Sequence, residues 1–216
     1  MDSVKIKAAS KRAYHHGDLR RELLAAAEAI ILERGVDGFT LREAARRVGV
    51  SPAAPAHHFK DARGLLTEVA MLGFRDFGQA LEAADRRGGE DPARRLAEQG
   101  RAYVDFALDC PARFQLMFRP EKLDQENAAL AAAAYHSYGV LEAAIRVATG
   151  TPAGSELSPD GHGLLLAVWS VVHGFAHLAL GGQLRDPAGE PVGREAMIDT
   201  LLPLMLRHLP AARTEL

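Results

Sequence analysis

The sequence has few of the residues that mark several protein classes. Its 216 residues include one cysteine, Cys110, which excludes an intrachain disulfide framework and a cysteine-rich zinc site and fits a cytoplasmic protein. Residues 1–16 carry charges but no apolar run of the kind found in a signal peptide, so none is expected. Strand-forming runs are scarce, and Ala, Leu, Glu and Arg dominate. We therefore expect an all-α fold.

The net charge of -2 conceals an asymmetry along the chain. Residues 1–66 contain 12 Lys and Arg against 8 Asp and Glu, whereas residues 67–216 contain 14 against 20. The first part therefore attracts phosphate and the second does not.

The longest apolar stretch, residues 163–181, approaches the length of a membrane span. It contains Ser170, His173 and His177, and no basic anchor flanks it. We expect a buried or dimer-forming helix and no membrane association.

Residues 40–59, TLREAARRVGVSPAAPAHHF, predict two short helices joined by a tight glycine turn. Thr40 and Glu43 have the spacing of a capping box, and Gly49 suits the left-handed end of a helix. Ser51 is the expected cap of the second helix and Pro52 its first residue. Pro55 would remove only one hydrogen bond, so this helix should continue. The pattern is typical of a helix-turn-helix that places its second helix in a DNA major groove, although tandem capped helices also occur in ordinary bundles.

A supporting helix precedes this motif. Asp18 is its expected cap, apolar residues recur from Leu19 to Ile31, and Gly35 ends it. With this helix the chain resembles the TetR family of transcriptional regulators, through LLAAAEAIILERGVDGFTLREAARRVGVSPAAPAHHF and the GLLTEVA that follows. YHHGDLR and the later WSVVHG at residues 169–174 are similar to the branch whose ligand domain is marked by Trp, His and Gly.

The resemblance implies an all-α chain with an N-terminal three-helix helix-turn-helix domain and a larger helical ligand-binding and dimerisation domain. We expect a basic arm at 1–16, a DNA-binding head at 17–66 and a body at 67–216. The implied function is a ligand-responsive, cytoplasmic regulator, a repressor that binds a palindromic operator as a homodimer and is released by a small molecule of unknown identity. No enzyme activity, cofactor or metal is expected.

The expected DNA contacts lie on the arm, the two short helices and the residues that follow them. The arm is equally well explained as a solvated tail. The second helix offers no Arg, Asn or Gln before residue 60, so thymine methyl contacts and DNA shape should contribute to recognition. The predicted DNA-binding residues are Lys11, Arg12, Thr40, Arg42, Ser51, Pro52, Ala53, Ala56, His57, Lys60 and Arg63.

The sequence departs from the family at two places in this region. Ala56 and His57 stand where relatives commonly have an aromatic pair, and Ala62 replaces a usual lysine. These changes put phosphate anchoring at those positions in doubt, and Lys60, Arg63 and the arm are the candidates to compensate.

Aromatic, sulfur and histidine side chains in the body are either core or the lining of a ligand pocket. The predicted ligand-binding residues are Phe106, Cys110, Phe114, Met117, Phe118, Tyr135, Tyr138, Trp169, His173 and His177. The two histidines are four residues apart, a spacing that could hold a metal, but no glutamate stands beside them. A small-molecule or metal-binding protein without operator binding is therefore the alternative function.

The last two helices, expected at about 160–182 and 193–209, carry wide apolar faces. Two heads are needed because one short helix reads too few base pairs, and a two-fold dimer matches a palindromic operator. The predicted interface residues are Leu165, Val168, Val172, Met197, Leu201, Leu204 and Met205.

Overall fold

The computed structural model describes residues 16–207, and helices account for all of its regular structure apart from one isolated bridge between Arg185 and Pro191. The all-α prediction is confirmed. The first elements are α1 (His16–Arg34), η1 (Val36–Gly38), α2 (Leu41–Arg47), α3 (Ala56–Phe59) and α4 (Ala62–Gly88). The next are α5 (Pro92–Asp109), α6 (Pro111–Met117), η2 (Pro120–Lys122), α7 (Ala128–Ala148) and α8 (Pro159–Leu180). The last are α9 (Arg194–Ala196), the π-helical turn η3 (Met197–Leu201) and α10 (Leu202–Arg207).

Short polar side chains fix the starts of the long helices. The Asp61 carboxylate accepts a hydrogen bond from the Gly64 amide at 2.8 Å, and Asp91 caps α5 in the same way. Asn127 caps α7, which therefore begins at Ala128.

The first helix begins earlier than predicted. α1 starts at His16, so Asp18 lies inside it and is not its N-cap; an apolar repeat does not determine the terminal residue of a helix. Its end is as predicted, because Gly35 adopts a φ of 73° that L side chains rarely adopt.

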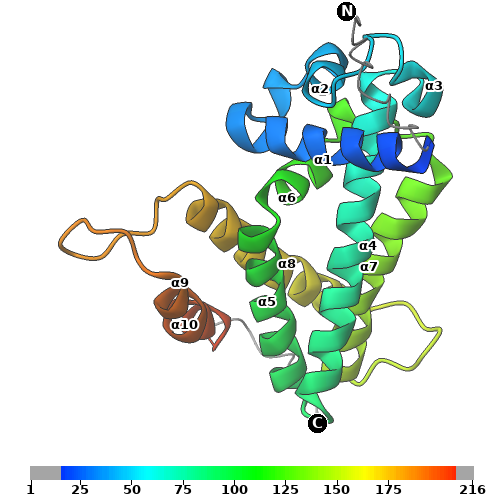
Figure 1. Cartoon of the computed structure of the whole chain (residues 1–216). Coiled ribbons are helices and arrows are strands. Elements are labelled where there is room, and N and C mark those ends of the chain that lie inside the picture. Colours follow the sequence, from blue (N-terminus) through cyan, green and yellow to red (C-terminus); the bar gives the residue numbers. More distant parts are fainter. Residues whose placement is uncertain (1–15, 208–216) are drawn as a thin grey trace, which may run out of the picture.

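The head and the body share one hydrophobic core. Buried Leu23, Ile30 and Phe59 of the head pack in the same cluster as Leu116 and Leu123 of the body. α4 passes from one part to the other, with α1, α2 and α3 gathered at one end of the molecule (Figure 1). The boundary at 66/67 is therefore not marked by a flexible linker.

The body is a bundle in which α4, α5, α7 and α8 surround a second cluster of buried residues. The segment after α8 loops away from the bundle before α9 and α10 return to its side (Figure 1). Here α9, η3 and α10 follow one another without a break, so residues 194–207 are helical, in agreement with the helix predicted over 193–209. The helix contains a π turn just before Pro203, which has no N–H to donate to the preceding turn.

Candidate DNA interface and ligand cavity

The turn between the two short helices has the predicted geometry. The Thr40 hydroxyl oxygen accepts a hydrogen bond from the Glu43 amide at 3.2 Å, which caps α2. Gly49 closes that helix with a φ of 74°, and the Val50 amide donates to the Ala45 carbonyl at 3.0 Å. Ala45 is fully buried, so a larger side chain would separate the helices.

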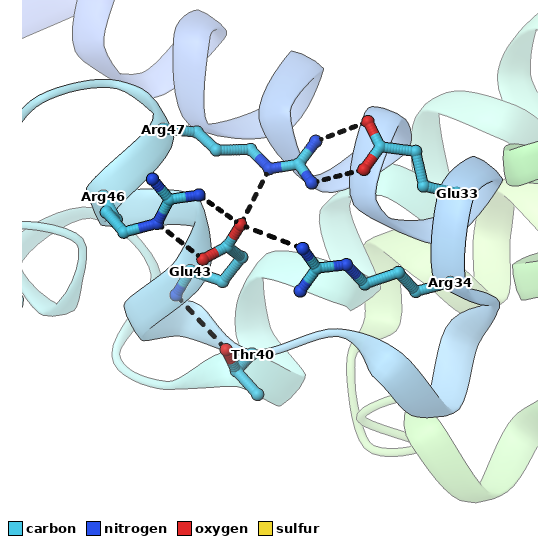
Figure 2. A network of polar contacts seen from close by, with 6 residues as sticks. All are labelled: Glu33, Arg34, Thr40, Glu43, Arg46 and Arg47. Carbon is cyan, nitrogen blue, oxygen red and sulfur yellow. Dashed lines mark hydrogen bonds and ion pairs between the residues drawn. The ribbon is translucent and has the colours of Figure 1, made fainter.

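The Glu43 side chain does something other than complete a capping box. Its carboxylate accepts from Arg46 at 2.8 Å and from Arg47 at 3.1 Å, and Arg34 lies 3.6 Å away (Figure 2). Hydrogen bonds from Arg46 and then Arg47 lower the pKa of Glu43 to about 2. Arg47 also donates to Glu33 of α1 at 2.8 Å. The network therefore joins α2 to α1.

The second helix of the motif is shorter than predicted. α3 begins at Ala56, and the chain from Ser51 to Pro55 forms successive turns, with the Ala54 amide donating to the Ser51 carbonyl at 3.0 Å. Pro55 explains the difference, because it lacks an N–H and disfavours helical geometry in the residue before it. Ser51 and Pro52 thus lie in a turn instead of starting a helix.

The predicted outward residues of this segment are exposed. The exposed set is Ser51, Pro52, Ala53, Ala56, His57 and Lys60, and Thr40 and Arg42 of the preceding element are exposed as well. Within the described part of the chain, no ion pair or hydrogen bond is recorded for the Arg42 or Lys60 side chain. Arg63 differs, because its guanidinium donates to the Leu123 carbonyl at 3.1 Å. Lys11 and Arg12 lie outside the described residues.

Lys60 has an unusual backbone. Its φ of 65° and ψ of -60° place it at the centre of a γ-turn, in which the Asp61 amide donates to the Phe59 carbonyl at 2.7 Å. This conformation is rare and strained for a residue with a Cβ. The turn connects α3 to the N-cap of α4, so it sets the position of α3 relative to the long helix.

The body contains a cavity of about 330 Å³ between α4, α5, α7 and α8. Four of the predicted ligand-binding residues line it: Phe118, Tyr135, Tyr138 and Trp169. Tyr135 is 78% exposed and therefore stands at the mouth.

The other predicted ligand residues lie elsewhere. Phe106, Phe114 and Met117 are buried in the body core, where their rings and sulfur fill the space between helices. Cys110 is partly buried at the edge of that core, and burial raises the pKa of its thiol. His173 and His177 are also absent from the wall.

Twelve wall residues were missed by sequence analysis. From α4 and α5 they are Phe74, Phe77, Leu81, Leu96, Gln99, Gly100 and Tyr103. From α7 and α8 they are Ala134, Ser137, Leu141, Val168 and Val172. Most are aliphatic or aromatic residues at helical spacing. Such a pattern looks the same in a sequence whether that face of the helix lines a cavity or packs in a core.

His173 supports the cavity wall from behind. Its Nδ1 lies 2.7 Å from the hydroxyl of Tyr103, which itself lines the cavity. Burial, and then the charge of His177, lowers the pKa of His173. Among the described residues no group of three or more His, Cys, Asp or Glu side chains could hold a metal, so the histidine pair has no third ligand there.

Four residues of the predicted interface are buried within the monomer, namely Leu165, Val168 and Val172 of α8 and Met197 of η3. Leu204 is 44% exposed, and the side chains of Leu201 and Met205 lie outside the described part.

α8 is the one described helix long and apolar enough to span a membrane, a test that core helices of soluble proteins also pass.

Comparison with known proteins identifies both parts of the chain. Residues 23–69 match the model of bacterial regulatory proteins of the tetR family, and residues 96–202 match the tetracyclin repressor-like C-terminal domain. The chain belongs to the TetR family. It is a DNA-binding helix-turn-helix regulator with a C-terminal ligand domain, and regulators of this family are soluble and usually dimeric.

Solved structures share the fold of this TetR-family chain. A protein of unknown function from Rhodococcus sp. RHA1 is 34% identical, with a TM-score of 0.69 over 92% of this chain and 99% of that one. PfmR, a TetR family transcriptional regulator from Thermus thermophilus, shares the fold at 22% identity, with a TM-score of 0.66 over 88% and 96% of the two chains. YobS, an uncharacterised HTH-type transcriptional regulator of Bacillus subtilis, is 27% identical over 100 residues, which span 46% of this chain and about half, 51%, of YobS.

In this TetR-family chain, ion pairs connect the head to the body. Asp37 of η1 accepts from Arg119 at 3.1 Å and from Lys122 at 2.5 Å. Arg113 of α6 reaches Glu28 of α1 at 2.8 Å and Asp76 of α4 at 2.5 Å. α6 and the residues after it are therefore in contact with both the head and α4.

Proposed function

We propose that the chain is a cytoplasmic repressor that binds a palindromic operator as a homodimer and leaves it when a small molecule enters the body cavity. The observation that carries this proposal is the adjacency of Phe118, which lines the cavity, and Arg119, which pairs with Asp37 of the head. A ligand that displaces Phe118 would pull on this contact with η1. Such a ligand favours one head position over another by its differential affinity for the two states.

The exposed residues around α3 support the head's role in DNA binding. Arg42 and Lys60 provide cations for phosphate, and Ala53, Ala56 and His57 provide short contacts for base edges. This face has few donors that discriminate bases, so we expect affinity to depend mainly on phosphate contacts and DNA shape.

The outward face of α8 is our proposed dimer interface. Leu166 and Leu178 are 43% and 42% exposed, and the small residues Gly163, Ser170 and Gly174 lie exposed between or beside them. A Cβ added at either glycine would meet nothing within 4 Å in the monomer. Glycine inside a helix costs about 1 kcal/mol relative to alanine. Close approach by the α8 of a second copy would explain why glycine stands at both positions.

Binding to DNA from the chain's own upstream region tests the proposal. We expect Arg42→Ala and Lys60→Ala each to weaken binding and to reduce the slope of log K against log salt by about 0.9. Arg86→Ala, at the far end of α4, is the matched control and should leave the slope unchanged. Equal slopes for all three variants would contradict the proposed DNA face, and no DNA binding at all would favour the alternative function.

Sedimentation tests the interface. The monomer has room for the side chain of Gly174→Arg, so this variant should yield folded monomers with greatly reduced operator affinity. The control is Ala129→Arg, at an exposed position of α7, which should remain dimeric. A dimeric Gly174→Arg variant would exclude this face.

A further inference from the structure

The cavity wall is aromatic and uncharged. Seven of its sixteen residues are Phe, Tyr or Trp, more than half of the 13 aromatic residues in the chain. Among the described residues, no Arg, Lys, Asp, Glu or His belongs to this wall. An anionic ligand would therefore leave water without meeting a counter-ion, which is strongly unfavourable. Flat apolar rings, in contrast, suit edge and face contacts with aromatic side chains.

The titratable groups near Gln99 and Tyr103 do not line the cavity. Asp85 accepts from Gln99 at 2.9 Å and lies 3.5 Å from Arg95, whose Nε is buried without a hydrogen-bond partner among the described residues. His173 is held on the Tyr103 hydroxyl, and burial favours its neutral form. A charged ligand in the cavity would therefore meet none of these groups at the wall.

Gln99 carries a buried hydrogen-bond acceptor at the cavity wall. Its side chain is 3% exposed, and its amide nitrogen donates to Asp85 and lies 3.5 Å from the Val140 carbonyl. Because both partners can only accept, the nitrogen must face them. The amide oxygen, Oε1, is buried and has no hydrogen-bond partner among the described residues. Because Gln99 lines the cavity, a buried acceptor without a partner on its side chain favours a ligand that carries a donor.

We propose that the effector is a neutral, mainly aromatic molecule of about two linked ring systems, whose single N–H or O–H donates to Gln99. The size follows from the cavity of about 330 Å³, near the lower limit for small-molecule sites. This inference rests on the proposed function in taking the cavity as the effector site.

Two probes with the same ring system test the charge requirement. N-phenyl-1-naphthylamine is neutral and has one N–H, and 8-anilino-1-naphthalenesulfonate adds a sulfonate to the same rings. The chain's single tryptophan, Trp169, lines the cavity, so energy transfer from Trp169 reports binding there. We expect the neutral probe to bind the full chain at least tenfold more tightly. Equal or tighter binding of the sulfonate at Trp169 would overturn the proposal.

The role of the ligand's N–H is tested first with the parent chain and then with a Gln99 variant. The N-methyl derivative of the neutral probe, which has no N–H, should bind the parent chain several-fold more weakly. Gln99→Met should remove that difference, and exposed Gln79→Met should retain it. Equal binding of the two neutral probes to the parent chain would refute the role of Gln99, even if Gln99→Met fails to fold.

Operator binding measured in parallel separates this inference from the proposed function. If the neutral probe binds as described and the operator complex is unaffected, release by a cavity ligand is wrong and the cavity's preference stands. If the sulfonate binds better and releases DNA, the preference is wrong and the proposed function stands.

Discussion

Lys60 offers a direct test of the γ-turn between α3 and α4. A side chain at this φ and ψ costs about 1–3 kcal/mol, and glycine removes that cost but loses about 0.4–1 kcal/mol through its freer unfolded state. The midpoints of these two ranges differ by about 1.3 kcal/mol, so we expect Lys60→Gly to raise the free energy of unfolding by about 1 kcal/mol. For a chain of this length that corresponds to about 2–4 °C in Tm.

The same position separates stability from DNA binding. Lys60→Ala retains the strained Cβ and removes the ammonium, so it should weaken DNA binding and leave the Tm nearly unchanged. Lys60→Gly should weaken DNA binding equally while raising the Tm. Denaturant unfolding followed by circular dichroism, together with DNA anisotropy, measures both effects. If Lys60→Gly is no more stable than Lys60→Ala, Lys60 does not occupy a strained turn.

Three further predictions concern the head, its link to the body and pH. Gly64→Ala places a Cβ 2.0 Å from the Phe59 carbonyl oxygen, so it should destabilise the chain by about 1–3 kcal/mol and abolish DNA binding. The control is Gly139→Ala, whose Cβ meets nothing within 4 Å and which should have neither effect. Similar stability of the two variants would contradict the close contact between Gly64 and Phe59. Asp37→Asn should change stability little but reduce the effect of the neutral probe on the DNA Kd, and an unchanged effect would exclude this contact as the coupling route. His173→Gln should flatten the pH dependence of the free energy of unfolding. Burial lowers the pKa of His173, so the contribution of its neutral side chain to stability is present above about pH 6.5 and is lost as the pH falls. Identical pH profiles for the variant and the parent chain would contradict the lowered pKa.

Local rules were reliable where one residue type determines the backbone. Gly35 and Gly49 both adopt the positive φ expected at helix ends, and Asp61 and Asp91 both cap the helices that follow them. The rules failed around Pro55, where a missing N–H and the restricted residue before it combine to delay α3 by a turn. The lost hydrogen bond was expected to have a small effect, whereas the restriction on the residue before Pro55 was not considered.

Side-chain roles were harder to predict, because the spacing of apolar residues along a helix does not show what the apolar face packs against. α8 has one face against its own core and another exposed, and both contain leucines at helical spacing. The stronger apolar face was taken as the interface, yet it packs inside the monomer. The exposed face is marked instead by glycines that nothing in the monomer requires.

The shared core gives the coupling between ligand and DNA a physical basis. Leu116 of α6 and Leu123 after it are packed among head residues, and Phe118 lies between them in sequence at the cavity wall. A closely packed core transmits small displacements instead of absorbing them. Movement of Phe118 by a ligand should therefore move the α6 region and Asp37 together. A head joined by a flexible linker would receive no such signal, and this difference is what the Asp37→Asn variant measures.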